Sequence, residues 1–517
     1  MLMTRSAQVG LFDAAVVMGP LPEGSFYALL AEHGDRIVRD SDFTECYSAR
    51  LGRPSIPPSL LAKVMLLQHR TGVSDEQAME CVAWDLRWKV ALGLPVDHQG
   101  WHPTSLTKFR ARLLLHRKEG LALENTLRLA GELGMLDGTV EQIIDSTPML
   151  GAAATQDTVR LVRHGVRKLI DAVSALGQEV GRTLGDGLEF DYERPGEKPD
   201  CRWREKAERE RMLTRVAQDA ARALSAVEQS EGLLGDPQIK AAHELLGELV
   251  GQDFDIDQEG VPRLHRGTRS DRIISTVDTE MRHGRKSSQH GFDGYKLSAA
   301  ASNGSEPLIT AVHVSAGGES DGAQAKHLID AQPSERRPAR VLGDTAYGNG
   351  PVRAELAERG VNVLAPVPEG RFAEGRIGKR EFRIDLDAGT VTCPAGQTVA
   401  ISVSKSGLRG ASFSRSICGA CPLKAACCAG RPRRQINVRE HENLLLAARQ
   451  ALADPATAEY LRHKRPRIER LLGLLAHRYG ARKSRYIGSQ KAHLQAAWAA
   501  ALVNLNPIGH HLAAQNT

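Results

Sequence analysis

Two short apolar runs in distant parts of the chain end in the same way, on an aspartate followed by turn-forming residues. In RVLGDTAYGNG the run ends on Asp344, and in TVEQIIDSTPML the run of Val140, Ile143 and Ile144 ends on Asp145. Such runs predict interior strands, and the glycines and proline behind them predict turns. An aspartate in a turn can simply bond its own backbone. Open α/β sheets, however, place ligands beyond the carboxyl ends of their strands, so the pair predicts a site.

The spacing of apolar residues divides the chain into helical and strand-rich regions. Residues 20–135 and 155–250 have helical periods, and 196–230 mixes both charge signs, which predicts an exposed helix without chemistry of its own. From residue 273 the segments IISTVDTEM, GYKLSAAAS, PLITAVHVSAG, RVLGD and VNVLAPV predict short strands. The later ones alternate with AQAKHLIDA and PVRAELAERG, which predict helices. The expected fold class is therefore α/β, with a mixed α+β sheet.

Length and composition describe an ordinary globular protein. The chain has 517 residues, of which 41% are hydrophobic and 25% charged, enough for about three domains. No run approaches the roughly 18 apolar residues of a membrane span. The start, MLMTRSAQVGLFDAAVVMG, has an aspartate inside its apolar part, unlike a signal peptide. We expect an intracellular protein without a membrane partner.

Eight cysteines in a chain of 517 residues are too few for a disulfide scaffold. Five of them lie between residues 393 and 428. The spacing of Cys393, Cys418, Cys421 and Cys427 would allow four thiolates to hold a structural zinc ion, as in zinc-ribbon-like units. Cys428 is an alternative to Cys427 as the last ligand. Reduced cysteines with a structural role are the other interpretation.

Residues 461–491 contain ten Lys or Arg residues and a single acid, Glu469. Glu469 lies beside an apolar helical stripe and on a row with Gly473 and Ala476, whose small side chains leave room for a ligand. A weak surface ion pair with Arg465 is the alternative role. The position at the core edge favours a site.

The segment HPTSLTKFRARLLLHRKEG predicts a basic helix among the short N-terminal helices. Short helices joined by tight turns are compatible with a helix-turn-helix, and equally with a bundle that has a solvated basic face. Further acids predict turn or surface residues rather than ligands; these are Asp278, Asp293 and Asp321. Four scattered histidines show no ligand spacing; these are His265, His283, His290 and His313.

Asp145 in IIDST, Asp344 in VLGDTAYGN and Glu469 in RPRIERLLG, followed by GARKSRYIG, resemble the three acidic motifs of bacterial insertion-sequence transposases of the DDE type. The similarity also covers PPSLLAKVMLLQHRTGVSDEQA, HPTSLTKFRARL, TVDTEMRHGRKS, GYKL and the cysteine cluster. It implies a ribonuclease-H-like catalytic core with three further units and a tail. The expected divisions are an N-terminal helical DNA-binding domain (1–138), the core (139–154, 270–372 and 440–505), an inserted helical domain (155–269), a Cys-rich insertion (380–435) and a tail (506–517).

The resemblance implies that Asp145, Asp344 and Glu469 bind two Mg²⁺ or Mn²⁺ ions and catalyse strand cleavage at element ends and strand transfer into target DNA. Relatives often have a Lys where this chain has Ala476, and His477 or Arg478 could substitute for it. Arg465, four residues before Glu469, keeps the spacing that is usual in the family. The implied partner is double-stranded DNA, bound by a homodimer or larger assembly in the cytoplasm, on the bacterial nucleoid. Residues expected to contact DNA phosphates are Lys108, Arg110, Arg112, Arg465, Arg467, Arg478, Arg482, Lys483 and Arg485.

Two other functions that involve DNA are also compatible with these residues. The chain could be a catalytically inactive or regulatory DNA-binding protein, but all three carboxylates are present, which favours an active enzyme. It could also be a hydrolytic nuclease that uses the same site and never joins ends. An aspartyl phosphatase is disfavoured because neither Asp145 nor Asp344 begins a D-x-D motif.

Overall fold

The computed structural model describes residues 1–5, 10–48, 50, 52–136, 141–267, 269–287, 289–369, 375–404 and 407–515. Val140 and the expected domain limits at 138 and 372 lie outside these residues. Within them, no helix is both long and apolar enough to span a bilayer.

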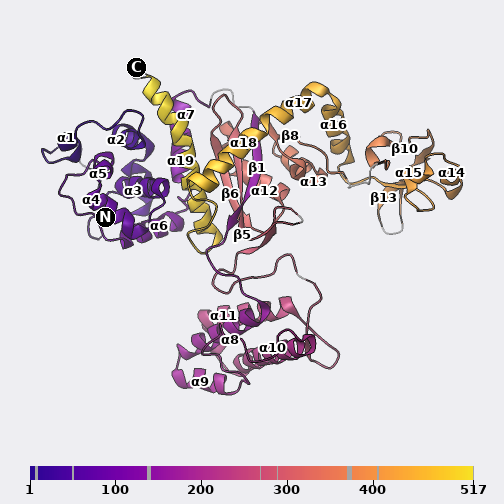
Figure 1. The fold of residues 1–517 in the computed structure, drawn as a ribbon, viewed down its shortest axis with the longest axis horizontal. Coiled ribbons are helices and arrows are strands. Elements are labelled where there is room, and N and C mark those ends of the chain that lie inside the picture. The colour runs from indigo at the N-terminus through magenta and orange to yellow at the C-terminus, as the bar shows by residue number, and fades with distance from the viewer. Residues whose placement is uncertain are drawn as a thin grey trace.

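A six-stranded mixed sheet forms the centre of the molecule (Figure 1). Its strand order is β4-β5-β1-β7-β8, with β6 also paired to β5. Strand β1 runs antiparallel to β5 and parallel to β7, which in turn runs parallel to β8. The expectation of a mixed sheet is confirmed. The strands are β1 (Glu141–Leu150), β4 (Arg282–Arg285), β5 (Gly291–Ser302), β6 (Ile309–Ala316), β7 (Arg340–Leu342) and β8 (Asn362–Leu364).

Two sequence expectations about the strands are wrong. Strand β1 does not end at Asp145, because its pairing with β5 continues to Leu150. Pro148 is tolerated there because β7 has already ended, so its missing N–H interrupts no pairing between β1 and β7. Residues 273–281 are not a strand. Side-chain oxygens of Gln252 and Gln156 accept the backbone N–H groups of residues 273 and 276, in place of a neighbouring strand.

Helices cover both faces of the sheet, and consecutive residues of β1 point into different cores. Ile143 belongs to a large core shared with the N-terminal helices and α19 (Ser489–Gln515). Ile144 belongs to a smaller core with α12 (Asp321–Asp330) and α13 (Gly350–Ala357). This alternation is the period of two that a strand imposes.

The N-terminal region is helical, as expected. Ser74 and Gln77 form the capping box that begins α4. The helices are α1 (Ala14–Met18), α2 (Phe26–Ile37), α3 (Pro58–Thr71), α4 (Asp75–Trp84), α5 (Leu86–Leu92), α6 (Thr104–Leu115) and α7 (Leu121–Glu132).

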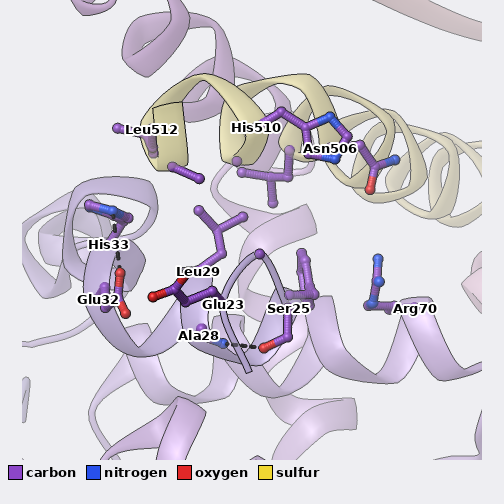
Figure 2. A pocket seen from close by; sticks show the side chains of 15 residues that line it. Glu23, Ser25, Ala28, Leu29, Glu32, His33, Arg70, Asn506, His510 and Leu512 are labelled. Atoms are coloured by element: carbon purple, nitrogen blue, oxygen red, sulfur yellow. Dashed lines mark hydrogen bonds and ion pairs between the residues drawn. The ribbon is translucent and has the colours of Figure 1, made fainter. Parts of the chain in front are cut away.

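The C-terminal helix α19 continues to Gln515, past residue 506, where we expected a tail to begin. Leu505, Ile508 and Leu512 are buried and keep the helical spacing of one apolar face. Near its end, α19 packs across the start of α2 around a hollow of about 220 Å³ (Figure 2). Gly509 fits there because an added Cβ would lie 3.2 Å from Leu29.

A helical insert leaves the sheet after β1 and returns before β4, and Figure 1 shows it on one side of the main body. It has its own apolar core. Its elements are α8 (Thr158–Ser174), α9 (Gln178–Asp186), α10 (Lys206–Gln229), α11 (Pro237–Asp253), β2 (Phe254–Ile256) and β3 (Pro262–Leu264).

A second insertion follows β8 and is built mainly of short strands around another apolar core. Its elements are β9 (Arg383–Asp385), β10 (Thr390–Thr392), β11 (Thr398–Ala400), β12 (Ser402–Val403), β13 (Arg409–Ser412), α14 (Arg415–Gly419), α15 (Lys424–Cys428) and β14 (Gln435–Asn437). The chain then returns through α16 (Glu442–Ala453), α17 (Pro455–Lys464) and α18 (Pro466–Gly473).

The burial of His69 indicates that acid destabilises the fold. His69 is buried in α3, stacks on Trp498 of α19 with ring centroids 6.5 Å apart, and its Nε2 has no hydrogen-bond partner among the described residues. Burial, with smaller effects of Arg485 and Arg110, lowers its pKa to about 3. Between pH 6.5 and 3 the unfolded chain binds a proton that the folded protein does not. Stability is therefore lost as the pH falls through this window.

We expect His69→Phe, which keeps a ring against Trp498, to weaken this pH dependence. From pH 7 to pH 5 the wild-type protein should lose about 2 kcal/mol more unfolding free energy than the variant. Urea unfolding at the two pH values measures the difference. The exposed His463 provides the control, because His463→Phe should leave the wild-type slope unchanged. Parallel pH profiles for wild type and His69→Phe would contradict the prediction.

Candidate functional site

The register of the sheet brings Asp145 and Asp344 to the same edge. Ile143 of β1 pairs with Leu342 of the parallel strand β7, so each aspartate lies two residues beyond this pair. Asp344 also caps the following turn by accepting the N–H of Ala346 at 2.8 Å. Its turn-forming role and its place beside Asp145 are therefore compatible.

Glu469 reaches the same place from α18. Arg465 Nη2 lies 3.6 Å from Asp145 Oδ2 and 3.5 Å from Glu469 Oε1, so one guanidinium contacts both carboxylates. Asp145, Asp344 and Glu469 line one cavity of about 480 Å³. The ion pair expected as an alternative for Glu469 is present, but it lies inside the cavity that also contains both aspartates.

The small residues beside Glu469 face this cavity as expected. Gly473 and Ala476 line it, together with His477. Residues 474–478 form a π-helical turn after α18, and such turns often occur at functional sites.

The carboxylates that line the cavity act on one another electrostatically. Burial, and then the charges of Asp344 and Glu469, raise the pKa of Asp145 to about 6, although the Ser146 N–H and Arg465 act against this. Tyr347 is fully buried close by, and its pKa is raised by burial and by Asp145, Asp321 and Asp344. These mutual effects indicate that the acids are near one another.

The carboxylates are near one another without forming a ready coordination sphere. Across the described ranges, no three His, Cys, Asp or Glu side chains are arranged to hold a metal ion. The donor set itself suits a hard cation, because all three candidates offer carboxylate oxygens. Repulsion among them, seen in the raised pKa of Asp145, would be relieved by such a cation.

Two residues of this cavity were missed by the sequence analysis. Lys296 of β5 lies 2.7 Å from Asp321 at the start of α12, and both line the cavity. Lys296 also donates to the carbonyl of Glu319, and only a tenth of its side chain is exposed. Asp321 was expected to be a turn or surface residue rather than a ligand; it is partly exposed, and its ion pair with Lys296 was not foreseen. Its position at a helix start after a long strand was the available signal.

Asp278 is also not a surface residue. It is 1% exposed and accepts hydrogen bonds from the Tyr295 hydroxyl at 2.6 and 2.7 Å. Asp293 is half-exposed and pairs with His283.

Several cations expected to bind DNA make internal contacts instead. Arg110 pairs with Asp75 and lies over Tyr486, which lowers its availability to phosphate. Arg467 donates to the Gly304 carbonyl at 2.8 Å, and Arg485 to the Val73 carbonyl at 2.6 Å.

The other expected cations keep more freedom. Lys108, Arg478 and Lys483 are exposed, while Arg112 lies over the Tyr47 ring and Arg482 donates to the Pro148 carbonyl at 3.2 Å. Of the expected group, Arg465 alone lines the acidic cavity, whose other cations are Arg285, Lys286 and Lys296.

The cysteines gather in the core of the second insertion but do not form the expected zinc site. Cys418, Cys427 and Cys428 are buried, and Cys393 packs against the same core. Burial, followed by the neighbouring Cys418 and Cys427, raises the pKa of Cys428 to about 11. With Cys421, these cysteines form no metal-binding group in the part of the chain described. Zinc is therefore unsupported.

Comparison with known families identifies the class of protein. Residues 392–508 match the family described as transposase DDE domain, and residues 17–112 match a transposase domain, DUF772. The first match includes Glu469 and the cysteines, while Asp145 and Asp344 lie outside it. No curated protein and no solved structure matches the chain.

The protein is thus a transposase by its two domains. More particularly, it belongs to the DDE-type insertion-sequence transposases, as the acidic motifs indicated. DNA binding follows from this family, and a divalent metal ion is its general cofactor.

The ion pair between Lys296 and Asp321 should make the effects of substitutions at these two residues on the free energy of unfolding non-additive. Lys296→Met should leave Asp321 without its partner and lower the free energy of unfolding by about 2 kcal/mol. Adding Asp321→Leu to this variant should recover part of the loss, because no unpaired charge remains. Urea unfolding near pH 7 measures both. The half-exposed pair Lys326–Glu355 is the control, and Lys326→Met should cost under about 1 kcal/mol. A double variant no more stable than Lys296→Met would contradict the coupling.

Proposed function

We propose that this transposase cuts DNA strands at element ends and joins them to target DNA by metal-dependent phosphoryl transfer, with Asp145, Asp344 and Glu469 as the catalytic acids. The observation that carries the proposal is their convergence, from two strands and a helix far apart in the chain, in one cavity. Basic residues at this cavity are suited to the phosphates of a DNA strand; they are Arg285, Lys286, Lys296 and Arg465.

The sheet supports a ribonuclease-H-like core. The strands β1, β5 and β6 are successively antiparallel, and β7 and β8 lie parallel to β1 on its other side. In this arrangement the central strand β1 carries one acid, and its parallel neighbour is followed by the second. The third comes from a C-terminal helix. This is the order in which the acidic motifs occur along the chain.

The three carboxylates fit Mg²⁺ or Mn²⁺, since both ions prefer oxygen ligands. Bound there, the metal would stabilise negative charge on the attacking and leaving oxygens of an in-line displacement at phosphorus. Asp145 and Asp344 would hold it from the sheet, and Glu469 from α18. Arg465 now lies between Asp145 and Glu469, so it is poised to turn toward a phosphate when a cation takes over the pairing.

The remaining cavity residues would bind and orient the strand. Arg285 and Lys286, at the end of β4, can neutralise phosphates on either side of the cut. Lys296 lines the cavity and is held in place by its ion pair with Asp321. Water would be the first nucleophile, and the freed 3′-hydroxyl the second. Two element ends must be paired before joining, so the working form would be a homodimer or larger assembly.

Catalysis gives the direct test. Asp145→Asn, Asp344→Asn and Glu469→Gln should each lower strand cleavage by roughly a thousandfold, because each weakens the binding of the metal ion that stabilises the transition state. Binding to duplex DNA should remain. A nicking assay on plasmid DNA that carries the element ends, with MgCl₂, measures cleavage.

Matched controls lie outside the cavity. Asp293→Asn changes a half-exposed acid and Glu459→Gln an exposed one in the same way, and both variants should cleave like the wild type. Wild-type cleavage by Asp145→Asn would contradict the proposal. Cleavage without joined products in a strand-transfer assay would identify a hydrolytic nuclease instead.

Metal binding can be followed without DNA. Saturating MgCl₂ should stabilise the wild-type protein, by about 2.7 kcal/mol at a hundredfold excess over the dissociation constant. Asp145→Asn/Asp344→Asn should lose this gain, because two of the three negatively charged ligands of the ion become neutral amides. Urea unfolding with and without MgCl₂ measures it, and Asp293→Asn is the control. An equal gain in the double variant would place the metal elsewhere.

A further inference from the structure

The net positive charge of the second insertion is larger than that of the whole chain. Residues 375–440, here named the insertion unit, contain twelve Lys or Arg and four Asp or Glu residues, a net charge of +8. The complete chain has a net charge of +6, so the rest is slightly acidic. A cationic unit of this kind is typical of proteins that contact polyanions.

Most of this charge is exposed and unpaired. Some cations of the unit are neutralised, as Lys379 by Glu442 and Arg380 by Glu381. Seven others are exposed and form no ion pair within the described residues. They are Arg383, Arg409, Arg415, Lys424, Arg431, Arg433 and Arg439.

Two of these exposed cations lie on the outward face of β14 and its flanking residues. Ile436 and Val438 point into the core of the unit, so Arg433, Gln435, Asn437 and Arg439 point outward by the period of two. The backbone stays extended past both ends of β14, because Phe413 donates to the Arg434 carbonyl and Val438 to the Arg409 carbonyl. We name Arg433, Gln435, Asn437 and Arg439 the β14 row.

The β14 row borders a hollow with further cations. Gln435, Asn437 and Arg439 line a space of about 220 Å³ between β14 and α16. Lys379 and Arg449 line it as well, and Glu369 is the acid among its lining residues. A phosphate group could enter between cations and amide donors there.

The insertion unit is tied to the body of the molecule. Lys379 of the unit and Arg449 of α16 both contact Glu442, which is 2% exposed at the start of α16. Figure 1 shows the unit at one end of the molecule, beyond α13 and α16. The β14 row therefore has a defined direction relative to the sheet.

We propose that the β14 row of the insertion unit binds the phosphate backbone of duplex DNA outside the acidic cavity. This inference rests on the proposed function for the identity of the polyanion. The row spans about 20 Å, over which a duplex presents about six phosphates on each strand. Arginines and amides bind phosphate oxygens without reading bases, so the contact is independent of sequence.

The test measures binding of a fluorescein-labelled random-sequence duplex at several salt concentrations. Arg433→Gln/Arg439→Gln should weaken binding about tenfold and lower the slope of log K against log salt by up to about 2. Arg182→Gln/Arg209→Gln is the matched control, because it removes from the helical insert two exposed arginines that form no ion pair with any residue the structure describes. It should bind like the wild type.

A charge-conserving variant separates charge from folding. Arg433→Lys/Arg439→Lys should bind within about twofold of the wild type, since point charges suffice for phosphate contact. Unchanged binding and slope in Arg433→Gln/Arg439→Gln, or equal losses in the lysine variant or the control pair, would overturn the inference. Displacement of the duplex by poly-glutamate at equal charge concentration would also overturn it, in favour of an acidic polypeptide.

The plasmid-nicking assay keeps this inference distinct from the proposed function. Normal binding through the β14 row with no metal-dependent cleavage would contradict the proposed function alone. Normal cleavage, with binding unaffected in Arg433→Gln/Arg439→Gln, would contradict the β14 row alone.

Discussion

The pairing of β1 with β5 on one side and β7 on the other is the constraint on which the site depends. The parallel register of Ile143 with Leu342 fixes Asp145 and Asp344 at the same distance beyond the paired residues. The long antiparallel pairing with β5 keeps β1 extended through Asp145 to Leu150. A slip of one residue would turn Asp145 to the other face of the sheet. Glu469 and Arg465 then approach from α18, which packs against β1.

Much of this arrangement could be predicted from local sequence. The apolar runs before Asp145 and Asp344 predicted interior strands, and the stripe beside Glu469 predicted a buried helix face, with Ile468 fully buried. Lys296 and Asp321 escaped because each is unremarkable in its own segment. Their meaning lies in a contact between β5 and α12, which no local period encodes. Residues 273–281 escaped for a related reason, because distant glutamines satisfy their backbone.

Basic residues that look alike in the sequence have different roles in the structure. Arg110, Arg467 and Arg485, which look like DNA contacts in the sequence, bind an acid or carbonyl groups of the fold. A count of basic residues on a helix cannot separate these uses, since long cationic side chains reach many partners. The insertion unit is different, because its exposed arginines exceed the acids available to neutralise them.

Both insertions occur in connections between elements of the core, so they do not interrupt the pairing of the sheet. The helical insert lies between β1 and β4, and the insertion unit between β8 and α16, and each has its own apolar core. The entropic cost of closing a loop rises only with the logarithm of its length, and a folded insert with near ends costs less still. The chain can therefore separate Asp145, Asp344 and Glu469 widely in sequence without separating them in space. A basic unit placed in such a position can contact DNA while the strands that carry the two aspartates keep their register.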